Sequence, residues 1–446
     1  MNNDITSICT KASEIILSLP KTDRIRVVSH YDADGITAAS IICKALIRKG
    51  YDIHASLMRN PFDKGIKRIS KEENQLIIFT DMGSGQINQI ENLKSKIIII
   101  DHHQALREKT KDNVFQINAN LCSINGNYEA CGATLAYVLA KTLDENNADL
   151  VDLAITGATG DKQYIGGFKG LNKKIIDEAV ERDLIKEEIR IKLSGENIFN
   201  ALYFSIDPYY SGLSGNKEAI KKLLEKLNIG PEERTEKIKD DKLKQLRSYL
   251  MFILIKKGCE KNILDTVIRP RYKTNTFNLE MERFADLLDS CGKGGHRGIG
   301  LSTAMGDKKS YEKALEFEKE YKKRILDELL RLESQGFKEK KSYRYFYCKD
   351  SSAGGVIGGI ATNFMLDNKK PLISIVKKDH ELHVSCRGNQ MLVEKGLDLG
   401  LAMKQIAEKL GGHGGGHAIA SGATLSDDKE KEFLEILEKI INKQIK

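Results

Sequence analysis

Four short apolar runs lie in the first hundred residues, and three of them are nearly continuous in Ile, Val, Leu and Phe. They are RIRVVS (24–29), YDIHASLM (51–58), QLIIFTD (75–81) and KIIIID (96–101). Strands that are buried on both faces have this composition, which is typical of a parallel sheet covered by helices. Helical patterns follow at 35–49, 131–144 and 149–158. The sequence therefore predicts a doubly wound α/β domain over residues 1–170.

A second, smaller α/β pattern occupies residues 336–446. Strands are predicted at 343–348, 371–378 and 380–386, and helices at 352–366, 401–410 and 427–444. A glycine-rich run, GGHGGGHAIASGATL (411–425), precedes the last helix. The fold class expected for the whole chain is therefore α/β in both terminal domains.

The middle of the chain has a different character. Residues 171–274 are rich in Lys, Glu, Leu and Ile at helical spacing, and residues 217–261 hold 13 Lys and Arg against 8 Asp and Glu. This pattern predicts a mainly helical insertion, which is either a solvated surface or a module that caps the site or docks a partner. Residues 275–335 contain the glycine-dense CGKGGHRGIGLSTAMGD segment, to which no role is assigned, and a long helix that is a plausible linker.

Composition bounds the cellular setting. The 446 residues carry 71 Lys and Arg against 63 Asp and Glu, a net charge of +8 that permits a polyanionic partner. No apolar stretch approaches the ~20 residues that span a bilayer. The N-terminus lacks the basic lead and small-residue cleavage site of a signal peptide. The 8 cysteines form no CxxC pair. We therefore expect a cytoplasmic protein that does not enter a membrane.

Side chains able to bind metal follow the first apolar run. His30, Asp32 and Asp34 lie in SHYDADG, and a spacing of two puts them on one side of an extended segment. Gly35 would then allow a sharp turn into the next helix. The alternative interpretation is a loop of polar helix caps.

The third and fourth runs strengthen the metal interpretation. They end at Asp81 and at Asp101, His102 and His103, and the carboxyl ends of parallel strands share one edge of a sheet. Asp161, in ATGDKQ, follows a predicted helix. Carboxylates packed together repel one another unless cations compensate. Carboxylate and imidazole ligands without thiolates suit Mn²⁺ or Mg²⁺ better than zinc.

The motifs HxDxDG, TD, DHH and GD, in this order, resemble those of the DHH phosphoesterase superfamily. At the other end of the chain, GGHGGGHAIASGA resembles the glycine-rich signature of the DHHA1 domain, and SCRGN supplies an arginine upstream of it. Within the superfamily the chain is most similar to archaeal RecJ-like single-strand exonucleases, the GINS-associated nuclease group.

The resemblance implies a role for each motif residue. Two Mn²⁺ or Mg²⁺ ions would be ligated by His30, Asp32, Asp34, Asp81, His102 and Asp161, with Asp81 bridging them. Asp101 would orient His102 or support a metal. His103 would contact the scissile phosphate or protonate a leaving oxygen, although a hydrogen-bonded histidine at the sheet edge is the alternative. Substrate would be bound by Arg387, Gly412, His413, Gly414, Gly415, Gly416 and His417.

Three functions follow from this resemblance. The first is a single-strand-specific exonuclease that hydrolyses DNA or RNA with two metal ions, in replication, repair or RNA turnover. The second is an oligoribonucleotide or cyclic-dinucleotide phosphodiesterase. The third is a replisome scaffold that binds GINS or a repair helicase. The intact ligand set favours an enzyme over a purely structural role.

Overall fold

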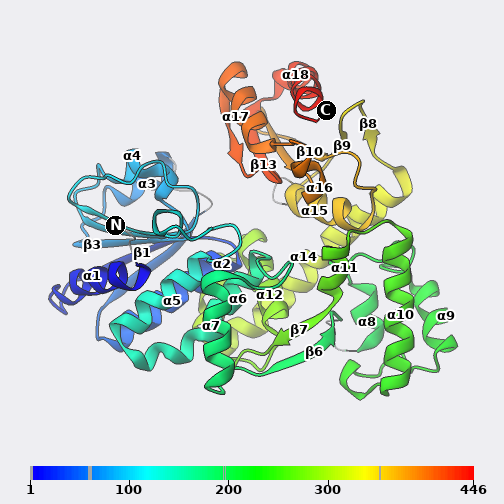
Figure 1. Ribbon diagram of the computed structural model, residues 1–446, viewed down its shortest axis with the longest axis horizontal. Helices are drawn as coiled ribbons and strands as arrows, with labels where there is room; N and C mark the ends of the chain where they lie inside the picture. The colour runs from blue at the N-terminus through cyan, green and yellow to red at the C-terminus, as the bar shows by residue number, and fades with distance from the viewer. Residues whose placement is uncertain (1–3, 59–62, 194, 196, 351–352, 446) are drawn as a thin grey trace. The chain divides into compact units, whose positions relative to one another are not determined.

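A computed structural model describes residues 4–58, 63–193, 195, 197–350 and 353–445 (Figure 1). The chain forms two compact units, and each is described by itself. The first comprises Met1–Arg190 and Arg269–Lys319, and the second comprises Ile191–Ile268 and Glu320–Lys446. These two units are not the predicted domains. The predicted division into residues 1–170, 171–274, 275–335 and 336–446 stays a prediction.

A five-stranded parallel sheet with the strand order β2-β1-β3-β4-β5 forms the centre of the first unit. Its strands are β1 (Ile25–His30), β2 (Ile53–Met58), β3 (Leu76–Thr80), β4 (Lys96–Asp101) and β5 (Val114–Asn118). The parallel sheet and four of its strands are confirmed predictions. The fifth strand, VFQIN, was not predicted, because its apolar run is broken by a polar residue.

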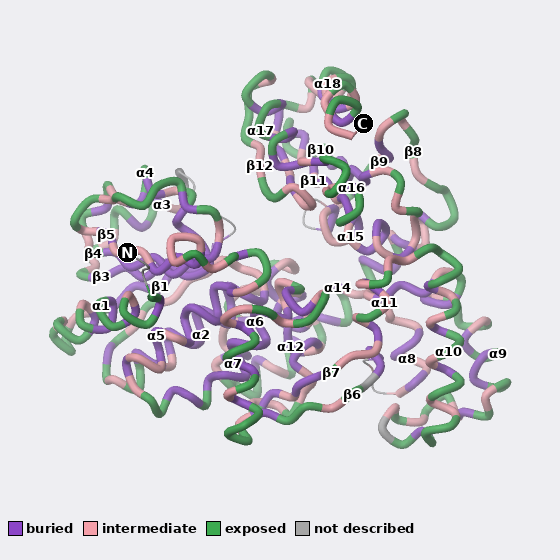
Figure 2. The backbone as a smooth tube through the Cα atoms, in the orientation of Figure 1, coloured by how far each residue is buried: buried purple, intermediate pink, exposed green. Residues whose placement is uncertain are grey.

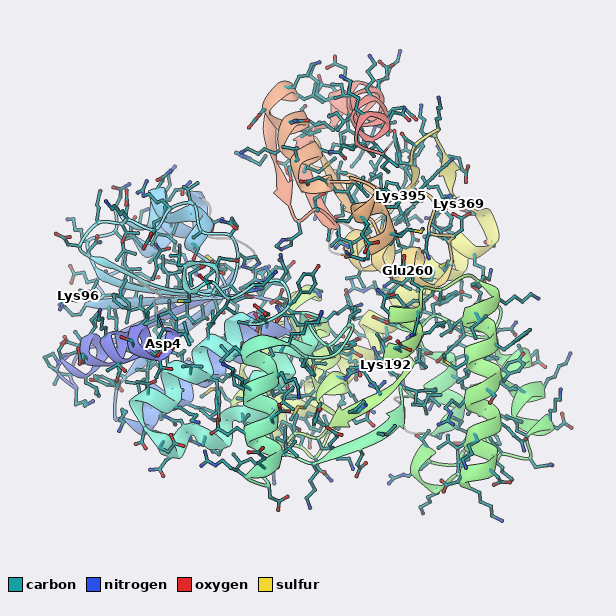
Figure 3. All side chains as sticks on the ribbon, in the orientation of Figure 1. Asp4, Lys96, Lys192, Glu260, Lys369 and Lys395 are labelled. Atoms are coloured by element: carbon teal, nitrogen blue, oxygen red, sulfur yellow. The ribbon has the colours of Figure 1, made fainter. Side chains whose placement is uncertain are left out.

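Helices cover both faces of this sheet, and alternate side chains of each strand face opposite cores. Ile98 and Ile100 of β4 join the core beneath α1, α2 and α5, whereas Ile97 and Ile99 join the core beneath α3 and α4. The strand β3 is buried along its whole length (Figure 2). In β4, Lys96, which is labelled in Figure 3, is exposed at the start of the strand, and the residues after it are buried. The covering helices are α1 (Ile5–Leu17), α2 (Ala33–Arg48), α3 (Asp63–Ile69), α4 (Ile87–Ile90) and α5 (Gly132–Leu143). Two further helices, α6 (Val151–Gly160) and α7 (Gly170–Glu181), pack against helices of this layer.

The glycine-dense segment before the second α/β domain is helical. It forms the end of α12 (Met281–Lys293) and α13 (Arg297–Met305), after which α14 (Lys308–Gln335) begins. The two short helices pack against α2. Gly292 permits this packing, because a Cβ atom there would lie 1.7 Å from the Tyr31 carbonyl oxygen. The segment therefore belongs to the wall around the HxDxDG motif.

In the second unit, a six-stranded sheet has the order β12-β13-β11-β10-β9-β8. Its elements are β8 (Lys338–Glu339), β9 (Arg344–Tyr347), α15 (Gly354–Phe364), β10 (Leu372–Lys378), β11 (Glu381–Arg387), α16 (Gln390–Glu394), α17 (Leu399–Leu410), β12 (Gly412–Gly416), β13 (Ala420–Ser426) and α18 (Glu430–Gln444). The strands and helices predicted here form, with their ends shifted by a few residues. The glycine-rich run forms a pair of antiparallel strands.

The insertion is mainly helical, as predicted. It contains α8 (Ile198–Tyr203), α9 (Lys217–Lys226), α10 (Asp240–Lys256) and α11 (Lys261–Val267), and it is flanked by the paired strands β6 (Glu187–Ile191) and β7 (Ile268–Tyr272).

All 8 cysteines are free. Among the described residues, no helix combines the length and the apolar character needed to cross a membrane.

Candidate metal centre

The HxDxDG motif spans a strand end and a helix start. His30 is the last residue of β1, and Asp32 is the N-cap of α2, where its carboxylate accepts a hydrogen bond of 3.1 Å from the Gly35 backbone N–H. Asp34 lies in the first helical turn, so the extended segment that we expected is wrong. Gly35 makes no turn. A Cβ atom there would lie 2.4 Å from the His30 carbonyl oxygen, so glycine lets the helix approach the strand.

Asp81 lies between the imidazoles of His30 and His102. It follows β3 with a φ of 55°, a left-handed backbone that non-glycine residues rarely adopt and that is often found at functional sites. Its Oδ2 atom is 3.4 Å from His30 Nδ1, and its Oδ1 atom is 3.2 Å from His102 Nε2. One carboxylate therefore faces ligand atoms from two sides.

His102 presents its Nε2 atom to three carboxylates. It lies 3.8 Å from Asp34, 3.2 Å from Asp81 and 3.3 Å from Asp161, which caps the C-terminal end of α6. The other ring nitrogen, Nδ1, donates a hydrogen bond of 2.6 Å to the Gly126 carbonyl oxygen. This hydrogen bond orients the ring as in metal-ligating histidines, whose second nitrogen usually donates to a fixed acceptor.

Asp101 and His103 form a pair beside the cluster. The Asp101 carboxylate accepts hydrogen bonds from the Ser84 backbone N–H, at 2.9 Å, and from Nδ1 of His103, at 2.8 Å. Burial opposes ionisation of Asp101, but His103 holds the pKa of this carboxyl below its usual range. Among the described residues, Asp101 is hydrogen bonded to Ser84 and His103 rather than to His102, and its predicted role, to orient His102 or support a metal, stays a prediction.

The predicted ligands form overlapping groups whose donor atoms lie within 4.8 Å of one another. One group is His30, Asp32 and Asp81. Another is Asp34, His102 and Asp161, and a third joins Asp81 and His102 with His103. The buried atoms His30 Nδ1 and Asp81 Oδ1 form no hydrogen bond with any described residue, although charged neighbours are close. Such converging donors fit two divalent cations that share Asp81.

Proton binding competes with metal at this centre. Burial, followed by the charge of Asp81, raises the pKa of Asp34 to about 7. Burial disfavours the charged imidazole of His102, but the neighbouring carboxylates raise its pKa well above the usual value. These shifts favour bound protons, and a cation that binds here would displace them.

We therefore expect Mn²⁺ binding to release protons and to weaken as the pH falls through about 7, where Asp34 becomes protonated. Titration calorimetry in buffers of different ionisation enthalpy counts the protons released. Binding that releases no proton at neutral pH would contradict this assignment.

Several residues that position the centre have no obvious sequence signal. Asp34 accepts hydrogen bonds from the Gly132 and Ala133 backbone N–H groups, at 2.7 and 2.8 Å, at the start of α5. A Cβ atom on Gly157 would lie 2.6 Å from the same carboxylate. Asp289 of α12 accepts a hydrogen bond of 2.8 Å from the Ala33 backbone N–H. The one sequence signal for these contacts is the pair of glycine-containing segments CGAT (131–134) and ITGATG (155–160), in which glycines lie beside polar residues.

In the second unit, the predicted substrate residues lie on β11 and at β12. Arg387 ends β11, and its side chain lies along the glycine face of α15, where a Cβ atom on Gly355 would be 2.8 Å from Nη2. The strand pairings place His413 and Gly415 on the sheet face of Arg387. Gly414 instead admits α17, because its Cβ atom would lie 2.4 Å from the Met403 carbonyl oxygen. Gly412 is in β12, Gly416 has a φ of 133°, and His417 begins the turn to β13.

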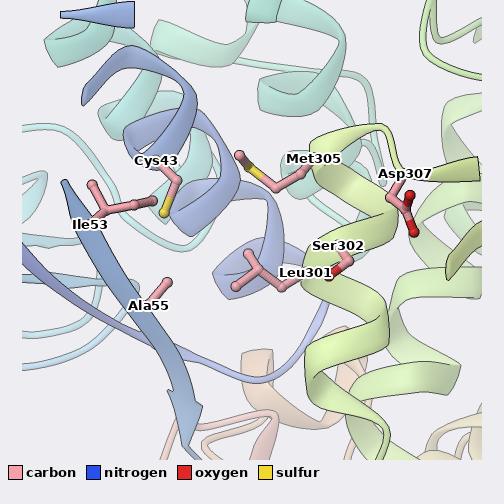
Figure 4. A pocket seen from close by; sticks show the side chains of 7 residues that line it. All are labelled: Cys43, Ile53, Ala55, Leu301, Ser302, Met305 and Asp307. Carbon is pink, nitrogen blue, oxygen red and sulfur yellow. The ribbon is translucent and has the colours of Figure 1, made fainter. Parts of the chain in front are cut away.

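A mainly apolar cavity of about 250 Å³ lies elsewhere in the first unit, between α2, β2 and α13 (Figure 4). Its lining includes Cys43, Ile53, Leu301 and Met305 and none of the predicted metal ligands.

Two family models match the chain. The N-terminal domain of the DHH family matches residues 24–158, and the DHHA1 domain matches residues 340–443. An uncharacterized protein of Methanocaldococcus jannaschii is 31% identical over 95% of this chain and 94% of its own length.

Solved structures share the fold. CDC45 from Entamoeba histolytica has a TM-score of 0.67 at 13% identity, covering 99% of this chain and 100% of that one. RecJ from Thermus thermophilus, solved with Mn²⁺, has a TM-score of 0.63 at 15% identity. That match covers 98% of this chain, which spans only 55% of the length of RecJ.

Proposed function

Because the chain belongs to the DHH/DHHA1 superfamily, whose members are phosphoesterases or nucleases, we propose that it is a metal-dependent exonuclease of single-stranded DNA or RNA. The position of Asp81 between two groups of nitrogen and oxygen donors carries this proposal. When bound, two Mn²⁺ or Mg²⁺ ions would activate water and neutralise charge on the phosphodiester.

The chain's own residues would hold the cations, contact the scissile phosphate and bind the substrate. His30 and Asp32 would hold one cation, Asp34, His102 and Asp161 the other, and Asp81 both. Asp101 accepts a hydrogen bond from the Nδ1–H group of His103 and so fixes the orientation of that ring. His103 would then contact the scissile phosphate or protonate the leaving oxygen. In the second unit, Arg387 would bind a phosphate, with Gly412–Gly416, His413 and His417 beside it.

End-labelled single-stranded DNA and RNA of one sequence, incubated with Mn²⁺ and resolved by length, test this function. A ladder of progressively shorter products from either nucleic acid, abolished by a chelator, is the expected result. Cleavage restricted to very short oligonucleotides or cyclic dinucleotides would favour the small-molecule phosphodiesterase. Activity that persists in excess chelator would reject the metal mechanism.

The glycine face of α15 gives a paired test of Arg387. We expect Gly355→Ala, like Arg387→Ala, to raise KM by about tenfold and to change kcat little, because its new methyl group displaces the guanidinium that binds substrate. Gly359→Ala is the matched control, since a Cβ atom there would lie 3.8 Å from Arg387 Nε, an ordinary contact. Steady-state kinetics on a short oligonucleotide measure both constants. If Gly355→Ala and Gly359→Ala raised KM equally, KM would not depend on the position of the Arg387 guanidinium.

A second candidate function, docking to a replisome protein such as GINS or to a repair helicase, is favoured by one surface of the insertion. Tyr249, Phe252 and Ile255 are spaced three residues apart on α10, and their exposed fractions are 42%, 61% and 58%. Large apolar side chains that gather on one helix face often mark protein interaction sites.

We expect Phe252→Asp to weaken binding to a purified GINS complex by at least about tenfold, because it removes an apolar anchor. Hydrolysis of a short oligonucleotide should stay unchanged. Lys221→Asp, on the exposed side of α9, is the control for added negative charge. Interferometry measures the binding, and equal losses for the two variants would remove α10 from the interface.

A further inference from the structure

The Arg297 guanidinium lies beside the candidate metal centre and is not used by the roles assigned above. It stacks over the Tyr31 ring with 5.0 Å between its central carbon and the ring centroid. Tyr31 in turn packs edge-on against the His30 imidazole, with 4.7 Å between the ring centroids. One aromatic ring therefore separates the guanidinium from a predicted metal ligand.

Arg297 differs from the other basic side chain of its segment. Lys293 pairs with Asp289, the residue that receives the Ala33 N–H. Arg297 has no carboxylate of the described residues within ion-pair distance, and its buried Nε atom lacks a hydrogen-bond partner among them. A guanidinium that no carboxylate neutralises is suited to an anion such as a phosphodiester.

The exposure of the cluster shows that a substrate can reach it on the side of Tyr31. The side chains of Asp34, Asp81 and His102 are 0%, 2% and 7% exposed. Those of His30 and Asp32, next to Tyr31, are 25% and 23% exposed, so the centre is open here as well as at His103, which is 43% exposed. Cβ atoms added at Gly295 and Gly298, on either side of Arg297 in the chain, would meet no atom within 4 Å, so there is open space beside the start of α13. Arg297 thus lies at the accessible rim of the centre.

Building on the proposed function, we propose that Arg297 binds the phosphate of the nucleic-acid strand next to the one held at the metal centre. A cation at the rim attracts the backbone of a strand that passes over Tyr31 and fixes its course next to the centre. Arg297 is then a substrate-binding residue for chains of more than one phosphodiester, and it takes no part in the hydrolysis of a single isolated diester.

The test measures binding and hydrolysis separately on the full-length protein. For binding, a short phosphorothioate single strand is titrated at several salt concentrations. We expect Arg297→Ala to weaken binding by about 10- to 100-fold and to make the slope of log K against log salt shallower by roughly 0.7, the value for one lost phosphate contact on a single strand. Arg297→Lys should keep the slope and recover only part of the affinity. Arg182→Ala, which removes a surface arginine already paired with Glu145 and Glu178, should change neither.

For hydrolysis, bis(p-nitrophenyl) phosphate is a substrate with a single phosphodiester and no adjacent phosphate. Arg297→Ala should hydrolyse it at the wild-type rate and lose activity only on oligonucleotides. An equal loss on both substrates would place Arg297 at the scissile phosphate, and a lower melting temperature with an unchanged salt slope would make it a support for Tyr31. Either result overturns the inference. Failure of the unmutated protein to hydrolyse any nucleic acid would instead reject the proposed function.

Discussion

Asp81→Asn is expected to abolish hydrolysis while the protein stays folded. The substitution removes a carboxylate that faces two imidazoles, at 3.4 Å from His30 and 3.2 Å from His102. Loss of a residue that merely supports a metal ligand costs about 10- to 100-fold, so we expect a larger fall here. Asparagine suits this position better than alanine, because it tolerates the left-handed backbone that Asp81 adopts.

A second buried carboxylate supplies the control. Asp152 of α6 is 3% exposed, compared with 2% for Asp81, and it accepts hydrogen bonds from Asn275 and Thr276 away from the metal cluster. Asp152→Asn should keep near wild-type activity, and the melting temperatures of both variants report on folding. Asp81→Asn activity above a few per cent of wild type in Mn²⁺ would reject the assignment of Asp81 as the shared ligand.

The second large effect concerns His103. Its side chain is 43% exposed, and Asp101 fixes the ring through Nδ1. Burial and the neighbouring His102 favour the neutral ring, but Asp101 raises the pKa of His103 above its usual value, so a proton is available. We expect His103→Ala to slow cleavage of a normal phosphodiester by about 100- to 10,000-fold, the usual contribution of a general acid.

The leaving group separates acid catalysis from metal binding. A p-nitrophenolate leaves without a proton, so His103→Ala should lose much less activity on bis(p-nitrophenyl) phosphate than on an oligonucleotide. Mn²⁺ affinity, measured by calorimetry, should change little. His54→Ala, at an exposed position on the edge strand β2, is the control. Equal losses on the two substrates together with weakened Mn²⁺ binding would make His103 a metal ligand.

The architecture of both α/β domains is predictable because buried parallel strands and amphipathic helices leave periodic apolar patterns in the chain. Residues 75–81 and 96–101 are nearly unbroken in apolar residues, and they became β3 and β4 with only small shifts of their ends. The strand β5 was missed because Gln116 breaks its short apolar run, so VFQIN shows neither a continuous apolar pattern nor a regular alternation.

The convergence of the predicted ligands also follows from sequence alone, because the ends of neighbouring parallel strands must meet at one edge. His30, Asp81 and His102 come together for this reason. Which partner each side chain selects is decided by tertiary packing. For example, the carboxylate of Asp101, at the end of β4, is hydrogen bonded to His103. Asp289 and Arg297 reach the centre only because α12 and α13 pack on α2, about 260 residues away in the chain. No local pattern encodes a contact over that separation, so those residues were visible only in the folded protein.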